Sequence, residues 1–119
     1  MRTVLIVEDE WAIADWLDVL LSEHAFNVLV AGNGREALDI LLRETPDLVL
    51  TDFMMPFVDG AGLITAMAAN DKDRDIPVVV MTSLLEHVVK DRAGKFRAYL
   101  RKPFREADLM KVIGEIFPE

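Results

Sequence analysis

The amino-acid sequence predicts an α/β fold in which helices cover both faces of a five-stranded parallel sheet. Short apolar runs and helical patterns alternate five times along the 119 residues. Several of the apolar runs are continuous, which is typical of strands that are buried on both faces. No linker or low-complexity segment interrupts the alternation, so we expect a single domain over residues 1–119.

The first half of the chain contains three predicted strands and two predicted helices. The strands are expected at Val4–Val7, at Asn27–Ala31 and at Leu48–Leu50, the last of which ends at Thr51 and Asp52. Apolar residues recur at helical spacing from Trp11 to about His24 and from Glu36 to Arg43. Asn33 is a candidate N-cap of the second helix, because its side-chain oxygen can accept a bond from a free helix N–H. The Thr45-Pro46-Asp47 segment then ends this helix.

The second half repeats the alternation after a loop that contains Pro56 and Gly60. A helix through Leu63, Ala66 and Met67 is followed by a polar connector from Asn70 to Asp75. The remaining strands are predicted at Pro77–Met81, ending at Thr82 and Ser83, and at Ala98–Leu100. A weaker helix covers about Leu84 to Arg92, and a final helix covers about Glu106 to Ile116. Strands that alternate with helices favour a parallel sheet with right-handed crossovers.

The composition excludes several classes of function. The chain has no cysteine, so thiol catalysis and thiolate metal sites are excluded. The net charge of −8 disfavours nonspecific binding of nucleic acid or of anionic membranes by this domain. The sequence contains no signal-peptide pattern and no apolar run near the ~18 residues that a membrane span requires. A soluble cytoplasmic protein is therefore expected.

Polar side chains follow four of the predicted strands at their carboxyl ends. They are Glu8 and Asp9 after the first strand, Asp52 at the end of the third, Thr82 and Ser83 after the fourth, and Lys102 after the fifth. Ligands of open α/β sheets bind at this edge, so these side chains are candidates for one site. Three carboxylates placed together repel one another, and Lys102 with a hard cation such as Mg²⁺ would offset their charge.

Such a site is suited to phosphoryl transfer. A carboxylate beside Mg²⁺ and a lysine can attack a phosphoryl group and become an acyl phosphate, which requires neither a histidine nor a cysteine nucleophile. His24 and His87 lie within predicted helices away from this edge, and we interpret both as structural or surface residues.

Four segments, in this order and spacing, resemble the receiver domain of two-component response regulators over essentially the whole chain. They are VLIVEDE at 4–10, DLVLTDFMMP at 47–56 with Asp59-Gly60, VMTS at 80–83 and YLRKPF at 99–104. The resemblance implies a flavodoxin-like (βα)5 fold with strand order 2-1-3-4-5 and one receiver domain over residues 1–119. It also implies that Asp52 accepts a phosphoryl group from a histidine kinase or a phosphotransfer protein. The protein would then not be an enzyme beyond its own phosphoryl transfer and slow self-dephosphorylation.

The resemblance further implies how the metal and the phosphoryl group are held. Asp9 and Asp52 would bind Mg²⁺ directly together with the backbone carbonyl of Met54, and Glu8 would act mainly through water. Thr82 would donate a hydrogen bond to the phosphoryl group.

Lys102 would pair with the phosphoryl group, and the bond from Lys102 to Pro103 would be cis. Tyr99 would swing inward as Thr82 moves, and this would change the surface of the fourth helix, fifth strand and fifth helix. We expect this surface to form a phosphorylation-dependent homodimer or to contact an effector. Its charged residues are Glu86, Lys90, Asp91, Arg97, Arg101 and Glu106.

Two residues of the site differ from those of fast-cycling family members. Met54 and Leu84 stand two residues beyond Asp52 and Thr82, at positions that in the family help decide how readily water attacks the acyl phosphate. Both side chains are apolar and cannot orient a water molecule, so we predict slow self-dephosphorylation.

The sequence leaves several interpretations open, both for single residues and for the function. Trp16 is predicted to be a core residue, whereas Trp11 either packs against the sheet or helps to dock the kinase. The basic residues between Lys90 and Arg105 form either a solvated face or a partner surface. A magnesium-dependent phosphohydrolase would commonly have a second aspartate where Met54 stands. A flavin-binding module would need a phosphate loop after the first strand, and a receiver that is never phosphorylated would not need the full acidic set.

Overall fold

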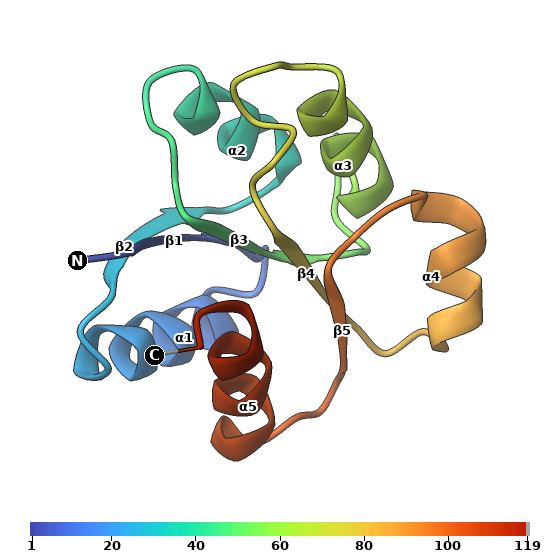
Figure 1. Cartoon of the computed structure of the whole chain (residues 1–119). Coiled ribbons are helices and arrows are strands. Elements are labelled where there is room, and N and C mark those ends of the chain that lie inside the picture. The colour runs from blue at the N-terminus through green and yellow to red at the C-terminus, as the bar shows by residue number, and fades with distance from the viewer. Residues whose placement is uncertain (119) are drawn as a thin grey trace.

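The computed structural model describes residues 1–118 and contains five parallel strands in one sheet, ordered β2-β1-β3-β4-β5 (Figure 1). Glu119, the last residue of the predicted domain, lies outside the described residues. The strands are β1 Thr3–Val7, β2 Asn27–Ala31, β3 Leu48–Asp52, β4 Val78–Thr82 and β5 Ala98–Arg101. The helices are α1 Trp11–Glu23, α2 Gly34–Leu41, α3 Gly60–Ala68, α4 Glu86–Ala93 and α5 Glu106–Ile116. The predicted fold class and strand order are thus confirmed.

Two apolar cores form because alternate residues of each strand point to opposite faces of the sheet. In β1, Leu5 and Val7 face the helices α2, α3 and α4, whereas Val4 and Ile6 face α1 and α5. All four side chains are fully buried. Figure 1 shows α2 and α3 on one side of the sheet and α1 and α5 on the other. This double covering explains why the strand sequences are continuous apolar runs.

The strand register brings the polar strand ends to one edge of the sheet. Val7 of β1 is aligned with Thr51 of β3, and Asp52 is aligned with Met81 of β4. Thr82 at the end of β4 is in turn aligned with Arg101 of β5. The residues that follow β1, β3, β4 and β5 therefore meet at the carboxyl edge.

Helix boundaries differ from the predicted ones by up to two residues where caps decide them. The Asn33 side chain accepts a bond of 2.9 Å from the Glu36 N–H, so Asn33 is the N-cap, as predicted. Helix α2 therefore begins at Gly34 and not at Glu36. Helix α4 begins at Glu86, two residues late, because the backbone of the N-cap residue Leu85 is extended, with ψ of 147°. The Leu84 N–H before it bonds the Thr82 hydroxyl.

Both tryptophans of α1 lie on the surface, so the prediction that Trp16 is a core residue was wrong, and one of the two interpretations of Trp11 is excluded. Trp16 is 42% exposed and rests against Phe104, with ring centroids 6.0 Å apart, instead of entering the core. Trp11 is 81% exposed and does not pack against the sheet. The buried positions of this helix are taken by Ala14, Leu17, Leu20 and Leu21.

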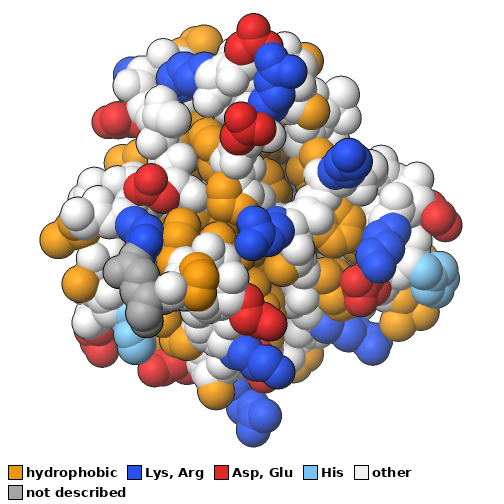
Figure 2. All heavy atoms as spheres, viewed as in Figure 1, with side chains coloured by type: hydrophobic (Ala, Val, Ile, Leu, Met, Phe, Trp, Pro, Cys, Tyr) orange, Lys and Arg blue, Asp and Glu red, His pale blue; other side chains and the backbone are white. Residues whose placement is uncertain are grey.

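The surface is mixed in charge. Figure 2 shows basic and acidic side chains interspersed over the face that it displays, with hydrophobic side chains visible between them. None of the helices in residues 1–118 has the length and hydrophobicity needed to cross a bilayer.

Candidate functional site

Three carboxylates converge at the carboxyl edge of the sheet. One oxygen each from Glu8, Asp9 and Asp52 lies within 4.8 Å of the other two. Glu8 and Asp52 are buried, at 1% and 6% exposure, whereas Asp9 is exposed. Backbone bonds fix this arrangement, because the Glu8 N–H donates to Ala31 of β2. Oxygen donors at such spacing fit a hard divalent cation.

Lys102 reaches into this cluster from the segment after β5. Its Nζ lies 2.7 Å from Oε1 of Glu8 and 3.5 Å from Oδ2 of Asp52. The second oxygen of Glu8 accepts a bond of 3.2 Å from the Glu10 N–H. The Lys102–Pro103 peptide bond is cis, as the resemblance implied. The lysine is thus bound more closely to Glu8 than to Asp52.

The pairing of Glu8 with Lys102 was not predicted from the sequence. The two residues are 94 positions apart, and β1 and β5 are not neighbours in the sheet. The one available signal is indirect: a buried carboxylate requires a charged partner, and Lys102 is the lysine at this edge.

Burial dominates the protonation of the two buried carboxylates. It raises the pKa of Asp52 above the ordinary value, although the charge of Lys102 and the Phe53 N–H lower it. Burial raises the pKa of Glu8 in the same way, against the hydrogen bond from Lys102. For Lys102, burial lowers the pKa, but the bond to Glu8 and the charges of Asp52 and Glu8 outweigh it, so the pKa is raised. If ionised, the three carboxylates carry more negative charge than Lys102 alone neutralises.

A chain of hydrogen bonds leads from this site to β5. Thr82 is 2% exposed, and its hydroxyl accepts a bond of 3.2 Å from the Leu84 N–H. The carbonyl of Leu84 accepts a bond from the Tyr99 hydroxyl. Thr82 and Tyr99, which were both predicted as site residues, are therefore linked through the backbone of Leu84.

The segment between β3 and α3 forms another wall of the site. Met54 in this segment is 54% exposed, and its Sδ lies 3.9 Å from a guanidinium nitrogen of Arg92 on α4. The segment packs so closely against α2 that a Cβ on Gly34 would lie 2.1 Å from the carbonyl oxygen of Val58. Its position is thus fixed by contacts on both sides.

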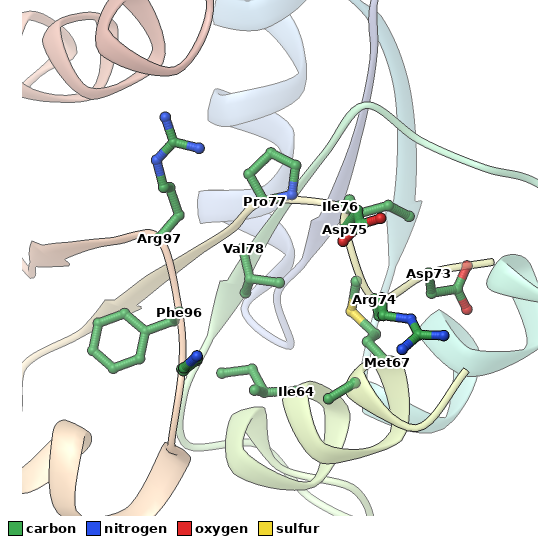
Figure 3. Close-up of a pocket in the computed structure, with 12 residues that line it drawn as sticks. Ile64, Met67, Asp73, Arg74, Asp75, Ile76, Pro77, Val78, Phe96 and Arg97 are labelled. Carbon is green, nitrogen blue, oxygen red and sulfur yellow. The ribbon is translucent and has the colours of Figure 1, made fainter. Parts of the chain in front are cut away.

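A separate cleft of about 460 Å³ opens at the other edge of the sheet (Figure 3). Ile64 and Met67 of α3 line one side, and Phe96 and Arg97, which precede β5, line another. Val78, the first residue of β4, also lines this cleft, whereas Thr82 at the far end of the same strand belongs to the acidic site. The cleft is therefore not part of that site.

Comparison with known proteins identifies the family of the chain. Residues 4–114 match the model of the response regulator receiver domain. The chain is 36% identical over 110 residues to a probable transcriptional regulator, ycf27, of Porphyridium aerugineum, covering 89% of this chain and 44% of the relative. The chain spans about half the length of such curated relatives.

Solved structures give the same result for the fold. The signal receiver domain of a histidine kinase from Syntrophus aciditrophicus has a TM-score of 0.91 and 29% identity, covering 99% of this chain and 91% of that one. The receiver domain of the sensor histidine kinase PA1611 from Pseudomonas aeruginosa has a TM-score of 0.90 and 22% identity, covering 99% and 98%. That structure holds a magnesium ion coordinated in its active-site cleft.

Proposed function

Because the chain belongs to the response regulator receiver domain family, we propose that Asp52 is its phosphoacceptor and that α4, β5 and α5 carry the signal onward. Receiver domains interact with histidine kinases or phosphotransfer proteins, which supply the phosphoryl group. One observation carries the proposal: Asp52 is buried beside Lys102 and within 4.8 Å of two further carboxylates. We also propose that residues 1–119 constitute one receiver domain.

The oxygen donors of the site support Mg²⁺ as its cofactor. We propose that Glu8, Asp9 and Asp52 hold the ion together with the backbone carbonyl of Met54. When bound, Mg²⁺ would neutralise carboxylate charge and the negative oxygens of the incoming phosphoryl group. This proposal rests on the chemistry of the three side chains, which are all carboxylates, because hard cations prefer oxygen ligands.

In the transfer step, an Asp52 carboxylate oxygen attacks phosphorus and the phosphorus–nitrogen bond to the donor histidine breaks. Asp52 must be ionised for this step, although burial raises its pKa. Lys102 would leave Glu8, to which it is bound at 2.7 Å, and move toward the new phosphoryl oxygens. The site can thus supply a positive charge at the moment when negative charge is added.

The hydrogen-bonded chain offers a route by which the signal leaves the site. The Thr82 hydroxyl can donate to a phosphoryl oxygen and would then pull on the Leu84 N–H that it holds. Movement of Leu84 would release the Tyr99 hydroxyl, which is bound to the Leu84 carbonyl. Tyr99 is half-buried, and we propose that it turns inward when Thr82 moves. A coupling of this kind requires that phosphorylation favours one of two arrangements.

The exposed surface of α4, β5 and α5 is the proposed output. Its charged residues all lie at the surface, and Glu86 and Lys90 form an ion pair of 3.2 Å across one helical turn. We propose that this surface forms a homodimer or binds an effector after phosphorylation. It does not bind nucleic acid in our proposal, because the chain carries a net charge of −8.

Mass spectrometry tests the central claim. The chain is treated with acetyl phosphate and Mg²⁺, and we expect one phosphoryl group, located on Asp52 by peptide mapping after reduction of the acyl phosphate. Asp52→Ala should abolish the adduct, and Asp39→Ala, at an exposed aspartate of α2, should retain it. An adduct of unchanged amount in Asp52→Ala contradicts the proposal.

We propose that the phosphoryl group on Asp52 is hydrolysed slowly. Met54 and Leu84 carry apolar side chains that cannot hold a water molecule in line with the phosphorus atom. We expect Met54→Asn combined with Leu84→Glu to speed the loss of phosphate at least about tenfold. This is less than the roughly 10²–10⁴-fold of a positioned general acid or base, because the new side chains would only orient the water. Phosphate release is followed after removal of the donor, and an unchanged or slower rate in the double variant refutes this explanation.

A further inference from the structure

The exposed thioether of Met54 lies beside Arg92, and the proposed function assigns no role to this contact. Among the methionines, Met67 and Met81 are buried, and Met55 is half-buried. Met54 is 54% exposed and stands two residues beyond Asp52, on the segment that leaves β3 at the acidic site. Its thioether is thus open to small oxidants at the mouth of that site.

The partner of this thioether is a guanidinium group. Nη1 of Arg92 lies 3.9 Å from Sδ, at the distance of a weak N–H···S bond. Arg92 has no carboxylate partner among residues 1–118, so its remaining N–H donors are available. A sulfur atom is a weak acceptor, whereas an oxygen placed on that sulfur would be a strong one.

We propose that Met54 is an oxidation site whose sulfoxide, held by Arg92, shortens the lifetime of the phosphoryl group on Asp52. The oxidant is a peroxide. The sulfur gives two electrons to the peroxide, the O–O bond breaks, and an S–O bond forms. The distal oxygen leaves as hydroxide and takes the proton from the oxygen now bound to sulfur, which gives the sulfoxide and water. The Arg92 guanidinium lies where it can donate to the departing oxygen and then to the sulfoxide oxygen.

The expected effect on lifetime follows from the change in polarity. A thioether at this position offers attacking water no strong acceptor, whereas a sulfoxide oxygen can accept a hydrogen bond from Arg92 and another from water. A bound water near the acyl phosphate should accelerate hydrolysis. This inference rests on the proposed phosphorylation of Asp52, and it adds a dependence on peroxide that the proposed function does not contain.

The experiment compares phosphate loss before and after hydrogen peroxide. The chain is treated with hydrogen peroxide, freed of it, and then labelled with acetyl phosphate and Mg²⁺. Peptide mapping measures oxidation of Met54, with Met1, at 91% exposure, as the internal reference. We expect Met54 to oxidise with Met1 and ahead of Met67, and phosphate loss to become about threefold faster, the size of effect that a single exposed hydrogen bond produces. Methionine sulfoxide reductases should restore the original rate.

Three variants separate the effect of Met54 oxidation from general oxidative damage. Each is compared with its own untreated sample. Met54→Leu should show no change in rate with peroxide, although Met1 is still oxidised. Arg92→Leu should reduce the acceleration, whereas Arg35→Leu, on the exposed face of α2, should retain it in full.

Three results overturn the inference: Met54 that stays reduced while Met1 is oxidised, an unchanged or longer lifetime with Met54 fully oxidised, or an acceleration that persists in Met54→Leu. Absence of any label on Asp52 in the untreated chain is a different outcome. It refutes the proposed function, and the inference falls with it.

Discussion

Replacement of Asp52 by asparagine should stabilise the folded chain when divalent metal is absent. Asparagine has nearly the same shape as aspartate and removes one negative charge from the acidic site. Glu8 and Asp9 each have an oxygen within 4.8 Å of an Asp52 oxygen, so each repels it. Lys102, at 3.5 Å, attracts it. The sign of the change depends on which of these effects is larger.

The distances give the magnitude. At an effective dielectric constant of ~20, the attraction at 3.5 Å amounts to ~4.7 kcal/mol, and each repulsion amounts to at least ~3.5 kcal/mol, the value at the 4.8 Å limit. Two repulsions exceed one attraction by about 2 kcal/mol, and burial of the Asp52 charge acts in the same direction. Because Asp9 is exposed, solvent weakens its share, and we expect a gain of about 1–2 kcal/mol for Asp52→Asn. For a chain of this length, that gain raises the melting temperature by about 4–8 °C.

The pH dependence provides an independent check. Since folding raises the pKa of Asp52, the folded chain takes up a proton at a higher pH than the unfolded chain does. The stability of the wild-type protein should therefore increase as the pH falls from neutral through the raised pKa. This increase ends below the ordinary aspartate value of about 3.9. The advantage of Asp52→Asn should accordingly shrink as the solution is acidified.

Thermal unfolding followed by circular dichroism in EDTA measures these effects. Asp39→Asn removes the same charge from an exposed position of α2 and should shift the melting temperature by far less. Added Mg²⁺ should stabilise the wild-type protein more than Asp52→Asn. The reasoning is refuted if Asp52→Asn in EDTA melts at or below the wild-type temperature at neutral pH.

Three further substitutions test close packing and hydrogen bonding elsewhere in the fold. Gly34→Ala should destabilise the fold by about 1–3 kcal/mol, because the new Cβ would lie 2.1 Å from the Val58 carbonyl oxygen. Gly114→Ala, in α5, meets no atom within 4 Å and should instead stabilise by about 0.5–1 kcal/mol, so equal effects in urea denaturation contradict this explanation. Lys72→Met removes the ammonium that bonds two carbonyl oxygens at the end of α2 and should cost about 1 kcal/mol in the same assay. An unchanged unfolding midpoint in this variant shows that the ammonium contributes nothing to stability.

Sequence periodicity was sufficient to predict the layers and the strand pattern, because the three central strands are largely apolar on both faces and the helices on one. The order of strands came from the family resemblance, since strands of similar composition do not reveal which neighbours they pair with. Trp16 shows where periodicity failed. It lies beside the apolar stripe of α1, but the surface position against Phe104 already buries part of its large ring.

The candidate site was predicted less completely. The strand ends predicted residues that the structure brings close together, namely Glu8, Asp9, Asp52 and Lys102, because parallel strands bring their carboxyl ends to the same edge. The pairing of Lys102 with Glu8 and the contact of Met54 with Arg92 depend on side-chain conformations across distant segments. No local pattern in the sequence encodes such conformations, so only the three-dimensional structure reveals these two contacts.

Few buried side chains hold helix α4 against the sheet. It buries only a valine and an alanine fully, Val89 and Ala93, and no side chain caps its N-terminus. Its start is set by Leu84 and Leu85, and it ends at Gly94 in the left-handed region, with φ of 71°. Local opening of this helix should therefore require much less free energy than global unfolding, and its amides should exchange hydrogen early. An input of a few kcal/mol at the neighbouring strand end can then rearrange α4 while the remaining sheet and helices stay folded.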